Sequence, residues 1–366
     1  MLAPGGEGSV IARWVVRPVK CCEACLPTTT CMFLSKIIVL WTQITRPVMN
    51  FGTHQTTRLS LRDLSLDLPW GGRMDIKTLM DFLNTIQSYH HDLVLSLGSN
   101  AKLCHYTTLE GALSILEKDD LWLSHLRFSN DDEELKYGHQ VVRDELRILS
   151  KGHFGAKQTL LDEVQERLSA AEDHPIYICC FCEVDNLLSQ WRGYAENGGG
   201  VSIEFEPEGF KAVVGGEVTS GLSRLWRVFY DQDLQRRIVD ACIDYPYWGS
   251  KSDDERAAHI VDAIHFFVPT FKNQDFRGEQ ERRLIFTPGG AEVQPPQYRV
   301  RSGMIVPYVC LKHIAPETSG KRLPIRAITV GPGRYRDLNR ESITMALSQW
   351  GYTGVEVRVS TTPYRG

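Results

Sequence analysis

The sequence predicts an α+β fold, in which helices intersperse a mixed or split β-sheet of about seven or more strands. Short apolar or alternating runs typical of strands recur along the chain, and helical patterns separate some of these runs but not others. A regular strand–helix–strand rhythm is not seen, which argues against a doubly wound parallel sheet. With 42% hydrophobic and 23% charged residues, the composition is that of an ordinary globular protein.

The first 73 residues differ from the remainder. They mix Gly, Pro, Thr and Arg with one short apolar run, which Lys36 interrupts and which no small-residue cleavage site follows. Met74 directly precedes a clean helical pattern over about 75–95. We interpret residues 1–73 as a non-native or disordered N-terminal extension and residues 74–366 as a single α+β domain. Whether Met1 or Met74 is the native start stays open.

The elements after residue 100 are expected in a definite order. Residues 101–107 read as a strand, and Leu109–Glu117 as a short helix, because Thr107 and Glu110 have the spacing of a capping box. A loop over 183–200 ends in three glycines. The further strands are expected at 121–128, 176–182, 201–207, 222–231, 279–288, 301–311, 325–332 and 355–365. The further helices are expected at 129–149, 156–171, twice within about 232–272, and at 336–351.

Charge and cysteine content narrow the class of protein. Residues 1–73 carry eight Lys and Arg against four Asp and Glu, so residues 74–366 carry 33 against 41. This acidic balance makes bulk, non-specific nucleic-acid binding unlikely. Of the ten cysteines, the six in residues 74–366 lie mostly in apolar runs, and Cys22-x-x-Cys25 has no second ligand pair. We therefore expect a reduced, cytoplasmic protein with no disulfide framework and no membrane partner.

His105 and Tyr106 lie where a strand passes into a helix. Such a hinge is a common place for ligand-facing residues in a mixed α/β protein. Adjacent strand residues face opposite sides, so only one of the two is expected to enter a shared cleft. The alternative interpretation is a hydrogen-bonded core histidine.

The loop over 183–200 concentrates polar and aromatic residues ahead of its glycines. Ser189, Trp191, Arg192 and Tyr194 are the candidates for ligand binding here. A guanidinium that forks phosphate oxygens, aromatic faces and close backbone approach all suit a nucleotide-type small molecule. The alternative is a tight turn into a strand with Trp191 packed in the core.

Two acidic residues stand at the start of a predicted strand. Glu279 and Glu281 are two residues apart, and the period of a strand would put both carboxylates on one face. Such a pair is either solvated, used on a ligand, or neutralised by Arg282 and Arg283 in a salt-bridged strand.

An acidic run over 130–134, with His105 and His125, has the residue types for Mg²⁺ or Mn²⁺. More often such a run caps a helix and favours its positive end. We assign no metal site from the sequence.

Five segments together resemble a mainly bacterial family, the domain of unknown function 2971 family. They are residues 105–138, 181–205, 276–286, 328–333 and 360–365. The resemblance spans roughly 100–366, and the family name implies no activity.

A second resemblance is to the ADP-ribosyltransferases, which hold NAD in a cleft between two small sheets. The His-Tyr-Thr strand end, the segment around Ser189 and the Glu-x-Glu strand carry it, although Ser189-Gln190-Trp191 is only a loose match to the family's strand motif. The resemblance implies that His105 bonds the nicotinamide-side ribose, that Tyr194 or Trp191 stacks on nicotinamide, and that Arg192 meets the pyrophosphate. Tyr106 and Ser189 would complete the NAD site.

The same resemblance assigns the chemistry to the two glutamates. Glu281 would steady the ribose hydroxyl and the cationic carbon formed as nicotinamide leaves, and Glu279 would orient or deprotonate an acceptor.

The leading hypothesis is therefore an ADP-ribosyltransferase-like enzyme that uses NAD as a substrate and acts on an unknown acceptor. The main alternative is a non-catalytic module that binds a nucleotide or a nucleic-acid end in stress or phage defence. A third hypothesis is a metal-dependent phosphodiesterase that uses His105 and the acids of 130–134.

Overall fold

The computed structural model covers the 366-residue chain and describes most residues from 102 onward, together with two short earlier segments. The described residues are 65–67, 73–75, 102–128, 133–152, 154–170, 174–207, 221–245, 252–288, 295–301, 303–314 and 322–363. The chain divides after Ser60 into two units, and all described residues belong to the second.

A small antiparallel ladder precedes the main body of the second unit. β1 (Ser65–Asp67) pairs with β2 (Arg73–Asp75), and Leu66 stands opposite Met74. β2 therefore includes both sides of the boundary that the sequence predicts at residue 73. The helix predicted over about 75–95 falls almost wholly outside the described residues.

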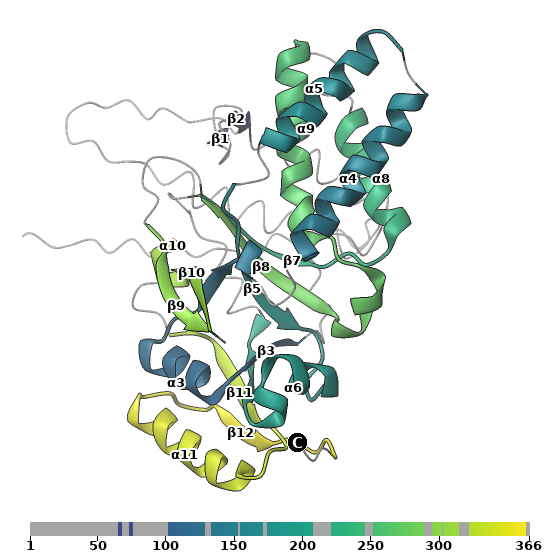
Figure 1. The fold of residues 1–366 in the computed structure, drawn as a ribbon. Helices are drawn as coiled ribbons and strands as arrows, with labels where there is room; N and C mark the ends of the chain where they lie inside the picture. The colour runs from purple at the N-terminus through teal and green to yellow at the C-terminus, as the bar shows by residue number, and fades with distance from the viewer. Residues whose placement is uncertain are drawn as a thin grey trace, which may run out of the picture. The chain divides into compact units, whose positions relative to one another are not determined.

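Ten strands of the described residues form one mixed, open sheet (Figure 1). Its order is β12-β11-β6-β3-β5-β4-β10-β9, and β8 also pairs with β5 and carries β7 on its other side. All its pairs are antiparallel except β11 with β12, which α11 (Arg336–Gln349) connects. The strands are β3 (Leu103–Thr107), β4 (Trp122–His125), β5 (Tyr177–Cys182), β6 (Val201–Phe205), β7 (Gly221–Arg227), β8 (Glu281–Pro288), β9 (Gln297–Arg301), β10 (Met304–Cys310), β11 (Ile325–Val330) and β12 (Glu356–Val359).

The sheet forks at β5. One edge of β5 pairs with β8 along its whole length, from Tyr177 to Cys182. The other edge is shared, because β4 pairs only at Tyr177 and Ile178 and β3 pairs only at Cys182. Between these contacts β3 and β4 diverge, and the middle of β5 has no strand partner on that side.

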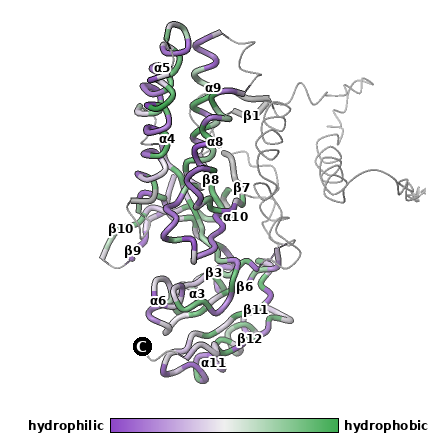
Figure 2. Tube along the Cα trace, turned by 90° about the vertical axis from the view of Figure 1, so that its right-hand side faces the viewer, coloured by the Kyte–Doolittle hydropathy of each residue, from purple (hydrophilic) through white to green (hydrophobic). Residues whose placement is uncertain are grey.

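Helices cover both faces of the sheet. On one face, α3 (Leu109–Lys118) and α11 pack their apolar residues against Leu103, Ile203 and Ile328 in the largest core cluster. On the other face, α6 (Leu188–Tyr194) contributes Trp191 to a cluster with residues of β3 and β5. The helices α4, α5 and α11 carry many hydrophilic segments (Figure 2).

Four longer helices group together beyond the β7–β8 edge (Figure 1). They are α4 (Glu133–Lys151), α5 (Ala156–Ala170), α8 (Gln232–Asp244) and α9 (Asp253–Phe267). Ser252 and Glu255 form a full capping box at the start of α9. The remaining described helices are the short α10 (Leu311–Ile314) and the 3₁₀ turns Leu126–Phe128, Glu196–Gly198, Val268–Thr270 and Gln274–Glu279. Within the described residues, no helix combines the length and apolar character that a membrane crossing requires.

The predicted fold class is confirmed, and three local predictions are wrong. The N-cap of α3 is Thr108, which accepts a hydrogen bond from the Gly111 N–H, and not the predicted Thr107. Residues 188–194, predicted as loop, form α6, because burial of Trp191 stabilises a short helix that lacks a side-chain cap. β9, at the edge of the sheet, was not predicted, because its exposed residues show no buried face.

Candidate functional site

A cavity of about 590 Å³ lies at the fork of the sheet. Its walls come from the end of β3, the first turns of α3, the middle of β5, α6, β9, and the turn before β8. Six of the eight residues that the sequence singles out line it: His105, Tyr106, Arg192, Tyr194, Glu279 and Glu281. Ser189 and Trp191 do not.

His105 lies in the gap between β3 and β4. Its Nδ1 is 2.9 Å from the carbonyl oxygen of Cys180, a group that neither strand reaches. Burial, together with the charges of Arg299 and Arg301, lowers the pKa of His105 to about 4, although the hydrogen bond with Cys180 acts in the opposite direction. The imidazole is therefore neutral at pH 7, with Nδ1–H donating to Cys180 and Nε2 left as a hydrogen-bond acceptor.

Glu279 and Glu281 meet at one ammonium group. Lys272 Nζ lies 2.5 Å from Glu279 Oε2 and 3.0 Å from Glu281 Oε2, and its side chain is only 2% exposed. Arg283 binds Glu281 through both Nε, at 2.8 Å, and Nη2, at 3.0 Å. The Tyr194 hydroxyl donates to Glu279 Oε1 at 3.4 Å.

The carboxylates of Glu279 and Glu281 differ in how fully cations engage them and in how exposed they are. Burial alone would raise the pKa of Glu281, but the charges and hydrogen bonds of Arg283, with Lys272, hold it well below its usual range. Both Glu281 oxygens are engaged by cations, and the side chain is 8% exposed against 17% for Glu279. Glu279 is therefore the carboxylate with more access to the cavity.

Glu279 and Glu281 lie close together, but not because they alternate on one strand, as the sequence analysis expects. Glu279 is the last residue of a 3₁₀ turn, Gln280 has a left-handed φ of 46°, and β8 begins only at Glu281. The strand period therefore does not set the relation between the two glutamates; Lys272, which the sequence analysis did not single out, holds them together.

Trp191 and Ser189 have different positions from those expected of NAD-binding residues. The indole of Trp191 is fully buried, 4.9 Å edge-on from the ring of Tyr106, and donates to Asn186 Oδ1 at 3.1 Å. A side chain without exposed surface cannot stack on a ligand, so Trp191 anchors α6 in the core. Ser189 is exposed on α6 and lies outside the cavity lining.

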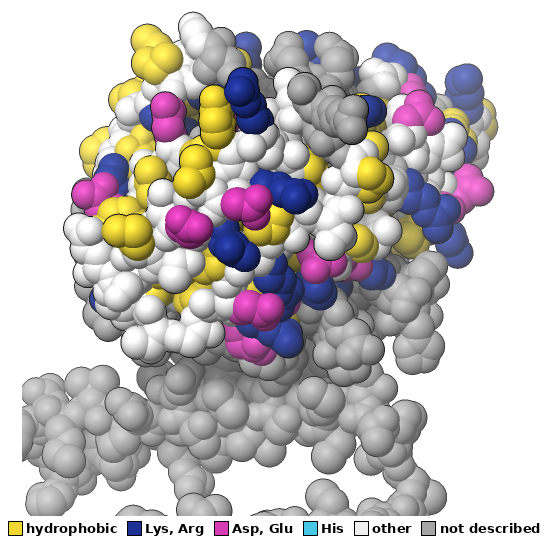
Figure 3. Space-filling view, turned by 90° about the horizontal axis from the view of Figure 1, so that it is seen from below, with side chains coloured by type: hydrophobic (Ala, Val, Ile, Leu, Met, Phe, Trp, Pro, Cys, Tyr) yellow, Lys and Arg dark blue, Asp and Glu magenta, His cyan; other side chains and the backbone are white. Residues whose placement is uncertain are grey.

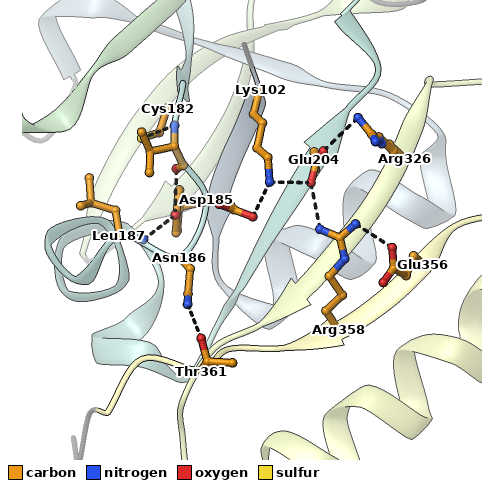
Figure 4. Close-up of polar contacts among 12 residues, drawn as sticks. Lys102, Cys182, Asp185, Asn186, Leu187, Glu204, Arg326, Glu356, Arg358 and Thr361 are labelled. Carbon is orange, nitrogen blue, oxygen red and sulfur yellow. Dashed lines mark hydrogen bonds and ion pairs between the residues drawn. The ribbon is translucent and has the colours of Figure 1, made fainter. Parts of the chain in front are cut away.

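Asn186 ties α6 to the C-terminal segment (Figure 4). Its side chain donates to Thr361 Oγ1 at 3.0 Å and accepts from Ser360, Thr362 and Trp191. Its φ of 59° is one that Asn tolerates better than most residues. This residue is a junction that fixes the start of α6, and with it the cavity wall that Arg192 and Tyr194 supply.

A second network braces the same region from the strands. The buried carboxylate of Glu204 on β6 faces Lys102 at 3.8 Å, Arg326 at 3.6 Å and Arg358 at 3.3 Å (Figure 4). Lys102 also reaches Asp185 at 2.5 Å, next to the Asn186 junction.

The glycines of 198–200 allow close backbone packing within the protein and do not form a ligand-binding loop. A Cβ on Gly200 would lie 2.2 Å from the carbonyl oxygen of Thr107, and one on Gly331 would lie 2.3 Å from that of Gly198. Gly331 and Gly333 donate to the carbonyls of Gly200 and Gly198, each at 2.9 Å. These residues allow two backbone turns to pack directly on each other.

Arg299 and Arg301 of β9 also line the cavity, and the sequence analysis did not identify them. Their sequence signal is alternation with Tyr298 and Val300, which marks a strand with one basic face.

A metal site finds no support among the described side chains. No group of three or more His, Cys, Asp or Glu side chains in that part of the chain is arranged to hold an ion. Asn130–Asp132 and the side chains of Glu133 and Glu134 lie outside the described residues. His125 contacts Tyr177 and Phe128 instead of the cavity.

One known protein family matches the part of the chain that supplies several cavity residues. A family model described as a protein of unknown function (DUF2971) matches residues 190–284. The DUF2971 resemblance is confirmed over these residues of the roughly 100–366 for which the sequence predicts it. The matched region runs from α6 into β8 and includes Arg192, Tyr194, Lys272 and both glutamates. No curated protein and no solved structure matches the chain.

The drawn surface over the end of the molecule that carries α11 has mixed charge. Lys and Arg side chains lie interspersed with Asp and Glu among the coloured residues (Figure 3). On this face no patch of one sign dominates the described side chains.

Proposed function

We propose that the fork cavity binds NAD in the cytoplasm and transfers its ADP-ribose to an unidentified acceptor. The observation that carries the proposal is the convergence of Glu279, Glu281, Tyr194 and His105, from three separate segments, on one cavity. A carboxylate can stabilise the oxocarbenium-like charge that develops as an N-glycosidic bond breaks, and imidazole and phenol groups can hydrogen-bond the sugar hydroxyls.

The proposed reaction breaks the bond between the ribose C1′ and the nicotinamide nitrogen. The electron pair leaves with nicotinamide, and a nucleophile of the acceptor forms a new bond to C1′ while its proton passes to a carboxylate. The developing positive charge on the ribose is stabilised by a preorganised anion nearby.

The contacts of the two glutamates support a division of roles. Because Arg283 and Lys272 already occupy both oxygens of Glu281, we assign Glu281 to positioning Lys272 and, through it, Glu279. Glu279 is the proposed catalytic residue, and the Tyr194 hydroxyl orients it by donating to its Oε1. His105 Nε2 is the proposed acceptor for a ribose hydroxyl.

The compensated charge of Glu281 also favours a second candidate, a non-catalytic nucleotide-binding module. A carboxylate held by two cations contributes less to stabilising a cationic transition state than a free one. In that case the cavity would bind NAD or a related nucleotide without turnover.

A proton NMR time course of NAD with the full chain tests both candidates. Nicotinamide signals that grow with the parent and not with Glu279→Gln support transfer or hydrolysis. Broadened NAD signals without release support the binding module, and sharp, unchanged signals at millimolar NAD contradict both. Glu163→Gln, which alters an exposed pair with Arg167 on α5, is the matched control and should behave as the parent.

A further inference from the structure

The cavity has a second charged end, on β9. Arg299 donates from Nη2 to Ser124 Oγ at 2.7 Å, and its guanidinium lies over the rings of Trp122 and Tyr308, at 5.1 and 5.6 Å. Its Nε is buried and has no hydrogen-bond partner. Arg301, two residues further, lines the same cavity.

These arginines lack the counter-ions that other buried arginines of the chain have. Arg282 pairs with Glu183 at 2.6 Å, and Arg283 pairs with Glu281 at 2.8 Å. No carboxylate of the described residues lies within ion-pair distance of Arg299 or Arg301, although Arg299 is partly buried. A guanidinium removed from water is ordinarily paired, so this end of the cavity is electrostatically incomplete.

Strand register relates the arginine end to the glutamate end. Arg299 stands opposite Val306 on β10; two residues on, Tyr308 is opposite Ser124, which is opposite Ile178 on β5. At the other end of β5, Cys182 stands opposite Glu281. With two residues per strand period, Arg299 and Glu281 share one face. Because Val306 lies two residues before Tyr308, Arg299 is level with residue 176, six residue steps or about 20 Å from Cys182 along the strand direction.

His105 lies between the two ends. Its ring bonds the carbonyl of Cys180, at a level of β5 between the two ends, and it lies within electrostatic reach of both arginines. His105 lines the same cavity as both charged ends, and a ligand that contacts both ends must be longer than a single phosphate group.

We propose that Arg299 and Arg301 bind a phosphate or diphosphate group of the ligand, so that the cavity accepts a nucleotide with its anionic part at β9 and its reacting part at Glu279. Guanidinium groups suit this role because they present paired N–H donors to phosphate oxygens. The assignment deepens the proposed function and rests on it only for the choice of NAD as the complete ligand. It also moves the main phosphate contact from Arg192, on α6, to β9.

Calorimetric titration of the full chain tests the assignment with inorganic phosphate, pyrophosphate, ADP-ribose and adenosine. Pyrophosphate and ADP-ribose should bind the parent, and Arg301→Gln and Arg299→Gln should each weaken them about tenfold to a hundredfold. Adenosine, which has no phosphate, should bind parent and variants alike. Arg336→Gln, in an exposed arginine of α11, is the matched control. Because Arg301 has no hydrogen bond or ion pair within the described part of the chain, its variant is expected to fold normally.

The outcomes separate this inference from the proposed function. Pyrophosphate binding that depends on the two arginines, without nicotinamide release, supports the phosphate site and contradicts the proposed transferase activity. Nicotinamide release that both arginine variants retain at parental KM upholds the enzyme and overturns the phosphate site. A parent that binds neither pyrophosphate nor inorganic phosphate also overturns it, whereas binding of inorganic phosphate without pyrophosphate restricts the site to a phosphate monoester.

Discussion

Replacing Lys272 by Met tests the most unusual feature of the site, a buried ammonium shared by two glutamates. The change keeps an unbranched side chain of similar length but removes the charge that lies 2.5 Å from Glu279 and 3.0 Å from Glu281. Removing one partner of a buried ion pair costs about 3–5 kcal/mol, because the other charge is left uncompensated. Arg283 still binds Glu281, so we expect the lower part of this range.

The loss of stability caused by Lys272→Met should be larger at neutral pH than at acidic pH. The folded pKa of Glu281 is held below its unfolded value of 4.5, so its stabilisation is present above about pH 4.5 and is lost as pH falls through the folded pKa. Without Lys272 the carboxylates take up protons more readily. The destabilisation should therefore be largest near pH 7 and smaller at pH 4.

Urea denaturation of parent and variant at both pH values provides the measurement. With an m value of about 3 kcal/mol/M, a loss of about 3 kcal/mol lowers the midpoint by about 1 M. Lys157→Met is the matched control, because Lys157 forms an exposed pair with Asp244 at 3.1 Å and should contribute at most about 1 kcal/mol. A Lys272→Met loss below about 1 kcal/mol, or one equal at pH 7 and pH 4, would refute the reasoning.

Three further predictions concern the structure around the site. Gly200→Ala should destabilise the protein by about 1–3 kcal/mol in thermal or urea unfolding, because the new Cβ would meet the Thr107 carbonyl oxygen. Gly193→Ala, which has open space around it, should not destabilise it. Equal effects of the two substitutions would contradict the close packing at Gly200. Asn186→Ala should lower the free energy of unfolding by about 1–3 kcal/mol, because it leaves the Trp191 indole N–H without its acceptor. Amide hydrogen exchange should become faster in α6 but not in α11. Unchanged exchange in α6 would show that Asn186 does not fix the helix. Burial, with the charges of His139 and His174, lowers the pKa of His265 to about 3, so its contribution to stability is present above about pH 6.5 and is lost as pH falls, by about 2 kcal/mol at pH 5. His265→Phe should reduce that loss between pH 7 and pH 5, and an unchanged pH profile would exclude His265 as its source.

The sequence predicts the elements well where hydrophobic patterning is strong. β3, α3, β5, β6 and α11 all lie within a few residues of the expected ranges, because each buries one face or both. β9 was missed because its exposed residues, Tyr298 and Val300, carry no sign of a core.

Local patterns identify residue types at the site but not their partners. They single out His105, Glu279 and Glu281, yet the cluster depends on Lys272, which comes from a separate turn and pairs with the glutamates only after folding. Likewise, nothing near Trp191 indicates that Asn186 and the C-terminal segment will hold it inward. The fork itself depends on which strands share the edge of β5, and such long-range pairing is not encoded in any short window.

The most direct test of the central claim is a crystal structure of the full-length Glu279→Gln variant with NAD. The account predicts density for NAD in the fork cavity, with its diphosphate at Arg299 and Arg301 and its nicotinamide ribose between His105 and residue 279. NAD bound elsewhere on the chain, or an empty cavity at saturating NAD, would contradict it.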